Sequence, residues 1–341
     1  MRMLLLENIL NCKDRPLLDA IALAIDNFVT LSPQQRYTLN FSGGKDSHVL
    51  LGIYLLYLKL NHTPLDLVVK FADTELESKD LYCVVEKAES WAELNQIAMM
   101  RVKSDKSYWF IQYALGYPVP THFARWCTGR LKIDPLEKAP RGQKRTPITG
   151  RHLGESSVRD KRLKSGCTSG ECGTDKIKKS IDPILHFTNC MVWDSLFYFD
   201  GIVLPKSSFD YLSQMYKQQE TTKEGSLRMG CFHCPVVAIK TLEKNVQNST
   251  LTEEGLQIRY HLEELRAAKR INNPRTKKAG AIHIEDRRKS WQGLDKDYLL
   301  KENYITQQDI DLIDETLKSD YAYPPLYKKE WIDQQHSFWT D

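Results

Sequence analysis

The sequence predicts an α/β protein in which helices cover both faces of a parallel, twisted sheet, followed by a mostly helical C-terminal region. Three observations predict this class. Short apolar strand patterns alternate with helical patterns over the first 150 residues, as in right-handed βαβ units. A glycine pair directly follows the first strand pattern. From about residue 252 onward, apolar residues recur at helical spacing.

The expected elements follow in chain order. Residues 1–36 form a helical lead-in, because their apolar residues recur at helical spacing. Helical patterns at 48–60 and about 77–93 separate the first three strand patterns. The strand patterns lie at 37–41, 65–71, 97–102 and 146–150. We therefore expect three regions: the lead-in over 1–36, an α/β domain over 37–240, and a helical, basic region over 241–341.

The composition is that of an ordinary globular protein, with 41% hydrophobic and 27% charged residues among 341. The apolar run at the N-terminus is interrupted by Glu7 and Asn8, and it is too short for the core of a signal peptide. No stretch reaches the roughly 20 apolar residues that a membrane helix needs. We expect a cytoplasmic protein without a membrane partner.

The sequence Ser-Gly-Gly-Lys-Asp-Ser at Ser42–Ser47 joins an apolar strand to an apolar helix. Gly43 and Gly44 allow a tight turn and close approach of a phosphate. Backbone amides at the start of the helix supply partial positive charge, and both serine hydroxyls can donate hydrogen bonds. Lys45 can neutralise phosphate charge, and Asp46 can either help to hold Mg²⁺ or cap the helix. The spacing differs from that of a Walker loop.

Charged residues also follow two other strand patterns. Asp73 lies at the end of the second strand, and Arg151 follows the fourth. Ligands of parallel sheets bind outside the carboxyl ends of the strands. We therefore expect Asp73 and Arg151 to converge with the loop.

The loop resembles the PP-loop of the adenine-nucleotide α-hydrolase superfamily, whose fold is Rossmann-like. This resemblance implies that residues 37–240 form an ATP pyrophosphatase domain that binds ATP with Mg²⁺ and cleaves between the α and β phosphates. It implies catalytic roles for Lys45, Asp46 and Arg151, and nucleotide contacts for Asp73 and Arg159. Lys45 and Mg²⁺ would stabilise the departing pyrophosphate, and the arginines would contact the α-phosphate or the acceptor.

Further segments resemble the PAPS-reductase-like branch of that superfamily. One of them, Gly150–Arg159, resembles the branch's Gly-x-Arg-x-x-Glu-Ser-x-x-Arg segment. The others are Phe71–Glu75, Arg125–Leu136, and Asp182–Ile184 with Val192-Trp193. With the loop, these segments occur in the branch's order over about 37–240.

The eight cysteines include a CxxC at Cys231 and Cys234. Alone, such a pair can ligate zinc, ligate an iron–sulfur cluster, or act as a dithiol. The resemblance implies that Cys127 joins the pair in binding a [4Fe–4S] cluster, which takes four thiolates. The sequence does not choose the fourth ligand, for which Cys172 is the working assignment and Cys167 and Cys190 are the alternatives. A zinc site remains open.

The segment Arg228–Cys234 most resembles that of the DNA phosphorothioation proteins DndC and SspD. This resemblance implies an ATP pyrophosphatase that adenylates a DNA backbone phosphate for sulfur incorporation and releases pyrophosphate. Its implied partners are DNA, a cysteine desulfurase and other phosphorothioation proteins. Basic residues cluster at 159–164, 176–179 and 266–289, and they suit a polyanion, although acidic residues are interspersed.

Three other functions remain open. A PAPS or adenylylsulfate reductase needs a nucleophilic cysteine near its C-terminus, and no cysteine follows Cys234. A tRNA thiolation enzyme would also combine a PP-loop with iron–sulfur cysteines. A non-catalytic nucleotide-sensing subunit would bind ATP without turnover.

Overall fold

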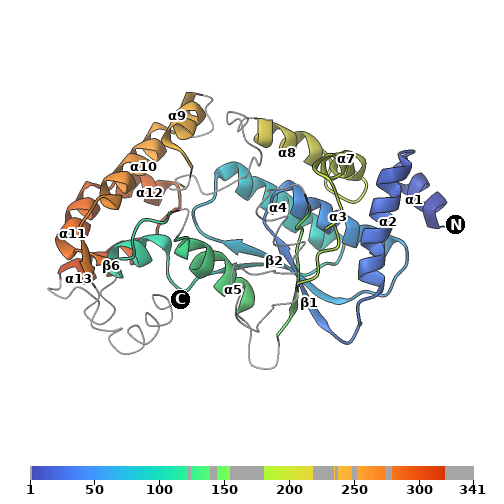
Figure 1. The fold of residues 1–341 in the computed structure, drawn as a ribbon, viewed down its shortest axis with the longest axis horizontal. Helices are drawn as coiled ribbons and strands as arrows, with labels where there is room; N and C mark the ends of the chain where they lie inside the picture. The colour runs from blue at the N-terminus through green and yellow to red at the C-terminus, as the bar shows by residue number, and fades with distance from the viewer. Residues whose placement is uncertain are drawn as a thin grey trace. The chain divides into compact units, whose positions relative to one another are not determined.

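The computed structural model describes residues 2–121, 124–138, 144–153, 180–217, 234, 237–247, 252–272 and 279–318. The chain divides into two compact units (Figure 1). Unit 1 comprises Met1–Ala72, Ser78–Val102 and Pro135–Met229, and unit 2 comprises Asp73–Glu77, Lys103–Asp134 and Gly230–Asp341. The predicted boundaries after residues 36 and 240 follow chain order and stay predictions.

A four-stranded sheet organises unit 1, with the strand order β3-β2-β1-β4. Strand β1 is central and pairs in parallel with β2 and with β4, so that Phe41 lies opposite Phe71. The strands are β1 (Arg36–Phe41), β2 (Asp66–Asp73), β3 (Met99–Lys103) and β4 (Thr146–Ile148). The carboxyl end of β1, where the glycine pair lies, is therefore flanked by the carboxyl ends of its neighbours.

Helices pack around this sheet. They are α1 (Arg2–Leu10), α2 (Arg15–Val29), α3 (Lys45–Lys59), α4 (Lys79–Leu94), the short α5 (Asp134–Glu137), α7 (Asn189–Phe199) and α8 (Ser208–Lys217). Asp14, Ser78 and Thr188 cap α2, α4 and α7, because each side chain accepts a hydrogen bond from the backbone N–H three residues later. Ser78 thus explains why α4 begins two residues after its predicted start.

Among the described helices of unit 1, α3 has the most buried residues, and the loop lies at its N-terminus. Its apolar residues pack against α2 and α7, which Figure 1 shows beside it. Gly52 permits the approach of α7, since a Cβ there would lie 2.4 Å from Cδ2 of Phe199. The loop is therefore anchored to the centre of the core.

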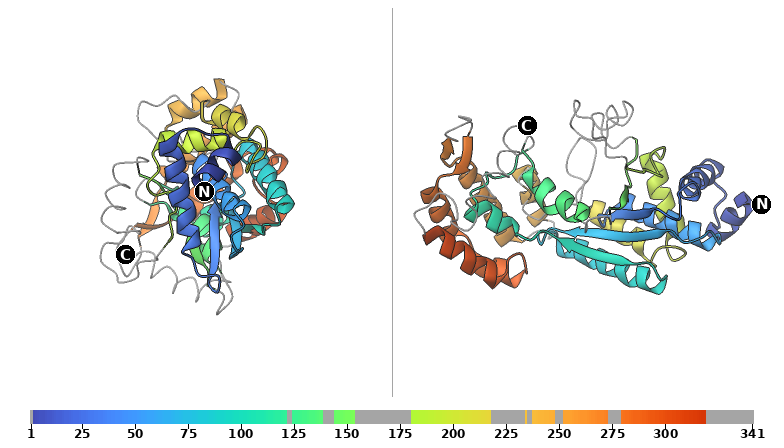
Figure 2. Two further views of the ribbon diagram at one scale, coloured as in Figure 1. Left: turned by 90° about the vertical axis from the view of Figure 1, so that its right-hand side faces the viewer. Right: turned by 90° about the horizontal axis from the view of Figure 1, so that it is seen from below.

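Unit 2 is mostly helical, with an aromatic core that includes Trp109, Tyr113 and Trp291. Its elements are the π-helices η1 (Phe110–Ala114) and η2 (Thr128–Ile133), the strands β5 (Arg270–Asn272) and β6 (Ala279–Ile282), and the helices α9 (Ile239–Gln247), α10 (Glu253–Arg266), α11 (Ile284–Gly293), α12 (Lys296–Lys301) and α13 (Gln307–Lys318). Figure 2 shows the later helices in orange and red.

The predicted class, an α/β protein with a parallel sheet and a mostly helical C-terminal region, is confirmed. The antiparallel β5–β6 ladder was not predicted, because strands of three and four residues carry no readable alternation. Among the helices that the structure describes, none is long and apolar enough to cross a membrane.

Candidate functional site

The backbone of the loop requires glycine at its first turn. Gly43 has φ of 75°, a left-handed conformation, and a Cβ there would lie 2.4 Å from Cδ1 of Leu81. Gly44 is the N-cap of α3, and no side chain caps the helix there. The predicted alternative in which Asp46 caps the helix is therefore wrong.

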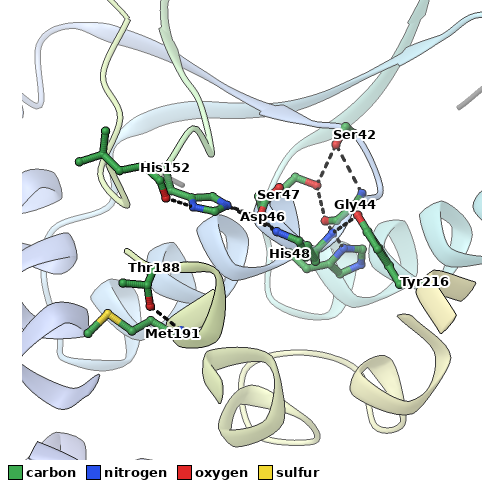
Figure 3. A network of polar contacts seen from close by, with 11 residues as sticks. Ser42, Gly44, Asp46, Ser47, His48, His152, Thr188, Met191 and Tyr216 are labelled. Atoms are coloured by element: carbon green, nitrogen blue, oxygen red, sulfur yellow. Dashed lines mark hydrogen bonds and ion pairs between the residues drawn. The ribbon is translucent and has the colours of Figure 1, made fainter. Parts of the chain in front are cut away.

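Both serines of the loop take part in its internal hydrogen bonds (Figure 3). The hydroxyl of Ser47 donates to the carbonyl of Gly44 at 2.8 Å, and the amide of Gly44 lies 3.4 Å from Oγ of Ser42. The two hydroxyl oxygens lie 3.3 Å apart. These contacts hold the turn in one shape and keep both hydroxyls beside the N-terminus of α3.

Three charged groups meet at the first turn of α3. Nζ of Lys45 lies 2.5 Å from Oδ1 of Asp46, and Nε2 of His152 lies 3.1 Å from the same oxygen. Nζ of Lys45 and Nε2 of His152 are 3.4 Å apart. His152 is only 1% exposed, and its Nδ1 lies 2.8 Å from the carbonyl oxygen of Leu153. We call Lys45, Asp46 and His152 the loop cluster.

The loop cluster shifts the pKa values of its acidic and imidazole groups in opposite directions. Burial acts to raise the pKa of Asp46, but hydrogen bonds from His152 and Lys45 outweigh it and lower that pKa. Burial acts to lower the pKa of His152, but the hydrogen bond to Asp46, the charge of Asp46 and the hydrogen bond to the carbonyl of Leu153 together outweigh burial and raise that pKa. Both ring nitrogens of His152 face oxygen acceptors, which is the arrangement that an imidazolium needs.

Two other side chains support the loop. Nδ1 of His48 donates to the carbonyl of Gly44 at 3.0 Å, and burial lowers the pKa of His48 to about 4, so this ring is neutral. The hydroxyl of Tyr216, on α8, accepts from the backbone N–H of Lys45 at 3.3 Å. That N–H belongs to the first residue of α3, a position that suits a phosphate oxygen.

Arg151 does not contact the loop in the described structure. Its Nε and terminal nitrogen donate to the two carboxylate oxygens of Asp182, at 3.0 and 2.5 Å, and it also bonds Thr149 and Ser180. These contacts make Arg151 part of a partly buried ion pair. The end of β4 does lie beside the loop, since a Cβ on Gly150 would lie 2.9 Å from the carbonyl oxygen of Asp46, and the predicted catalytic role of Arg151 stays a prediction.

The residue after β4 that meets the loop is His152, which the sequence analysis missed. A signal for it existed. The segment Gly-x-Arg-x-x-Glu-Ser has its arginine two positions after the glycine. Counted from Gly150, that position holds His152 and not Arg151. A Cβ on Gly150 would lie 2.9 Å from the carbonyl oxygen of Asp46, so β4 delivers its next residues directly to the start of α3.

The other predicted nucleotide contacts are less informative. Asp73 ends β2, and its Oδ1 accepts from the backbone N–H of Glu75 at 2.9 Å. Its predicted role at the nucleotide stays a prediction. Arg159 lies outside the described residues.

Two of the predicted cluster ligands lie close together in unit 2. Burial raises the pKa of the Cys127 thiol, and the neighbouring Cys234 raises it further, while Thr128 and Lys132 act to lower it. Cys172 and Cys231 lie outside the described residues, as does Cys167, and Cys190 is exposed on α7. Within the described ranges, no three His, Cys, Asp or Glu side chains form a group that could hold a metal.

A buried carboxylate lies in the same part of unit 2. Oε1 of Glu77 accepts from Nζ of Lys132 at 2.8 Å and from the hydroxyl of Thr74 at 3.1 Å. Glu77 is 1% exposed, and its Oε2 has no hydrogen-bond partner among the described residues. Glu77 is not among the site residues predicted from the sequence. We call Glu77, Cys127, Lys132 and Cys234 the cysteine region.

The basic run at 266–289 is partly structural. Arg287 is fully buried and donates to the carbonyls of Tyr113 and Ala114, at the end of η1. Arg270 donates to a carbonyl of β6, and Arg288 donates to the carbonyl of Leu317. These residues stabilise unit 2, so the run gives weaker support to a DNA surface than the sequence suggests.

Solved structures give a distant similarity. The U34-tRNA thiolase NcsA of Methanococcus maripaludis is 13% identical with a TM-score of 0.39, and the match covers 76% of this chain and 82% of that one. The phosphoadenylyl-sulfate reductase of Candida auris is 14% identical with a TM-score of 0.36, covering 62% and 94%. The FMN adenylyltransferase of Candida glabrata is 17% identical with a TM-score of 0.39, covering 94% and 89%.

Sequence relatives and a family model are more specific. Two uncharacterized proteins of Methanocaldococcus jannaschii, MJ0973 and MJ0066, are 30% identical over 217 residues and 28% identical over 207. These matches cover 62% and 60% of this chain, which spans less than half of either relative, at 44% and 37%. A family model for the phosphoadenosine phosphosulfate reductase domain matches residues 36–237, more than half of the chain. This protein therefore belongs to the phosphoadenosine phosphosulfate reductase domain family, within the PP-loop group of nucleotide-using enzymes.

Proposed function

We propose that this protein is an ATP pyrophosphatase that adenylates a DNA backbone phosphate for sulfur incorporation. The loop cluster at the N-terminus of α3 is the observation that supports the use of ATP. Glycine-rich backbone, a helix N-terminus and buried cations together suit a polyphosphate. The choice of DNA as the acceptor rests on the resemblance of the segment Arg228–Cys234 to the phosphorothioation proteins. The proposed partners are DNA, a cysteine desulfurase and other phosphorothioation proteins.

In this proposal the chain mainly positions phosphates and balances charge. The amides of α3, the hydroxyls of Ser42 and Ser47, and Lys45 would bind the triphosphate. An acceptor phosphate oxygen forms a bond to the α-phosphorus while the bond from that phosphorus to the bridging oxygen breaks, and pyrophosphate leaves with the electron pair. A sulfur nucleophile then displaces AMP from the adenylated acceptor. Lys45 would compensate the charge of the departing pyrophosphate.

Two cofactors belong to the proposal. The Asp46 carboxylate is an oxygen ligand of the kind that Mg²⁺ prefers, and a bound Mg²⁺ would supply charge neutralisation to the polyphosphate. Cys127 and Cys234 are close enough to interact, as two thiolates of one iron–sulfur cluster would be. Cys172 and Cys231 are the proposed remaining ligands, and such a cluster would supply sulfur-handling or redox chemistry.

Pyrophosphate release tests the proposal directly. Purified protein with Mg²⁺ and ATP should release pyrophosphate when an oligonucleotide is present, and Lys45→Ala should lower the rate about 100-fold or more. Lys59→Ala is a matched control, because Lys59 ends the same helix and is exposed. Release of inorganic phosphate alone, or release that does not respond to DNA, would contradict the proposal.

A sulfonucleotide reductase is the second candidate, and the family match over 36–237 favours it. Such an enzyme would release sulfite from phosphoadenosine phosphosulfate with a thiol donor. Incubation of the same preparation with that nucleotide and a reducing thiol separates the two candidates, because only the reductase would form sulfite. A tRNA thiolation enzyme would instead be revealed by loss of thio-bases from tRNA in a deletion strain.

A further inference from the structure

We propose that Glu263, on α10, is a positioning residue for Cys127 and Cys234, and that it acts by holding two arginines which fix the segments around these cysteines. This inference rests on the proposed metal-binding role of the cysteines, but not on the nucleotide loop or the identity of the acceptor. The family model ends at residue 237, so the inference assigns a task to a helix that follows the family domain in the chain.

Helix α10 is a firm support within unit 2. Its N-cap is Thr252, whose side chain accepts a hydrogen bond from the backbone N–H three residues later. Its buried apolar residues, which include Leu262 and Leu265, pack into the aromatic core of unit 2. The hydroxyl of Tyr260 donates to Oε1 of Glu243, on α9, at 2.5 Å. Side chains on α10 therefore start from a fixed backbone.

The carboxylate of Glu263 joins two arginines of its own helix. Its Oε1 forms an ion pair with Arg259, and its Oε2 lies 2.8 Å from Nη1 of Arg266. Arg259 lies about one turn before Glu263 and Arg266 about one turn after it, so the three side chains share one face of α10. The side chain of Arg259 is 2% exposed, and a charge buried to that extent needs a partner such as this carboxylate.

Arg259 reaches the turn that follows the CxxC. Its Nη2 donates to the carbonyl of Val237 at 3.4 Å. The N–H of Val237 in turn donates to the carbonyl of Cys234 at 3.0 Å, which closes a tight turn at this cysteine. The guanidinium of Arg259 therefore holds the backbone that carries Cys234.

Arg266 reaches the segment that precedes Cys127. Its Nη2 donates to the carbonyl of Pro120 at 3.4 Å. Two residues earlier, the carbonyl of Pro118 accepts from the indole N–H of Trp126 at 2.7 Å. Trp126 directly precedes Cys127 in the chain. The contact of Arg266 therefore steadies the segment that holds Cys127 in place.

One carboxylate thus links the backbone around both thiols. Cys127 and Cys234 are far apart in the chain but close enough in unit 2 for one to influence the other. Thiolates are the ligands that zinc and iron–sulfur clusters take, so the donors fit such a group. A metal binds more tightly when its ligands are already held together. Without the charge of Glu263, the two arginines would no longer be tied and the thiols would separate more readily.

Zinc affinity of the full chain tests this role, measured by competition between the reduced protein and a coloured chelator. Glu263→Gln keeps the shape of the side chain but removes its charge. It should weaken zinc binding about tenfold, as other changes to the support of metal ligands do. Arg266→Gln removes only the contact with Pro120 and should weaken zinc binding about threefold.

Disulfide formation in the metal-free protein is the second measurement. Diamide oxidises two neighbouring thiols to a disulfide and takes up their two hydrogens, and mass spectrometry of peptides follows the Cys127–Cys234 product. A Cys231→Ser background prevents the CxxC from closing on itself. Glu263→Gln should slow this product about tenfold, because the rate depends on how well the two thiols are held together.

Glu264→Gln is the matched control, because Glu264 is the next residue of α10, has the same charge and is exposed. It should change neither measurement. Melting temperatures show whether each variant folds, and a role in stability alone would lower them while leaving the affinity and the disulfide rate of folded protein unchanged.

An unchanged disulfide rate in folded Glu263→Gln overturns the inference, and so does an equal loss in Glu264→Gln. If Glu263→Gln does not fold, unchanged values in Arg266→Gln overturn it instead. No zinc binding by the original protein would remove the proposed cysteine cofactor, while the disulfide rates would still decide whether Glu263 positions the thiols.

Discussion

The loop cluster of unit 1 and the cysteine region of unit 2 use the same kind of contact in different ways. In each, a lysine ammonium meets a carboxylate: Lys45 lies 2.5 Å from Asp46, and Lys132 lies 2.8 Å from Glu77. The first pair consists of consecutive residues, whereas 55 positions separate the second. The Lys45–Asp46 pair therefore depends mainly on its local backbone, whereas the Lys132–Glu77 pair depends on the packing of distant segments.

The balance of charge also differs. At the loop, one carboxylate faces two cations, Lys45 and His152. In the cysteine region, one oxygen of Glu77 accepts from both Lys132 and Thr74 while the other has no hydrogen-bond partner among the described residues. The single carboxylate of the loop cluster is thus shared by two basic side chains, whereas Glu77 has one acceptor oxygen unused among the described residues. We therefore propose that the Lys45–Asp46 pair serves ligand binding and that the Lys132–Glu77 pair serves packing.

Replacing a glycine in each region should give the largest contrast. Gly43→Ala places a Cβ in a left-handed conformation and 2.4 Å from Leu81, so the loop must change shape. We expect pyrophosphate release to fall about 100-fold and the free energy of unfolding to fall by about 2 kcal/mol. Gly129→Ala in η2 meets no atom within 4 Å and should change both quantities little.

Activity assays and urea denaturation of the two variants check this contrast. Equal effects of Gly43→Ala and Gly129→Ala would break the comparison, because they would mean that local backbone shape matters no more at the loop than in the cysteine region.

Replacing each carboxylate by the neutral amide should have smaller effects, which differ between the two regions. Stability should fall most in the cysteine region, and pyrophosphate release should fall at the loop. Glu77→Gln keeps the buried shape but weakens the bond from Lys132, and we expect about 2 kcal/mol of lost stability with ATP affinity unchanged. Asp46→Asn leaves two cations without their carboxylate at a more exposed site. It should lower pyrophosphate release about tenfold or more with a smaller loss of stability.

Denaturation curves and calorimetric ATP titrations measure both outcomes. A loss of ATP affinity in Glu77→Gln, or full pyrophosphate release by Asp46→Asn, would show that the assignment of packing to one pair and ligand binding to the other is wrong.

The same contrast explains what could be predicted from the sequence. The four strands of the parallel sheet, the helix α3 and the loop Ser42–Ser47 were predicted because apolar periodicity and glycine chemistry act on neighbouring residues. His152 was missed because its position depends on β4 pairing with β1 and on the close approach at Gly150, which are long-range contacts. Arg151 was favoured because it follows the fourth strand pattern and because of the resemblance, and its ion-pair partner Asp182 is 31 positions away.

The cysteine region was predictable only in part. The pairing of Cys127 with Cys234 came from the resemblance, and the structure places the two close together. Glu77 could not be recognised, because a carboxylate in a charged sequence gives no sign of burial until Lys132 and Thr74 are placed around it. The full ligand set stays a prediction, since Cys172 and Cys231 lie outside the described residues.

The pH dependence of stability should give the smallest but most selective contrast. The raised pKa of His152 contributes stability that is fully present below its ordinary pKa of 6.5 and is lost as the pH rises through its higher value in the folded protein. The lowered pKa of Asp46 contributes stability above 3.8 that is lost only in more acidic solution. The raised pKa of Cys127 contributes stability that is lost only as the pH rises above 9.0.

These windows separate the two regions in one experiment. As the pH rises from 6.5 through the raised pKa of His152, the melting temperature of the original protein should fall by a few degrees, because of these three groups only His152 has an ordinary pKa near neutrality. His152→Gln should remove that slope, whereas Cys127→Ser should leave it in place and alter the curve only in more alkaline solution. A slope that persists in His152→Gln would assign the proton to another group of the protein and would contradict the raised pKa of His152.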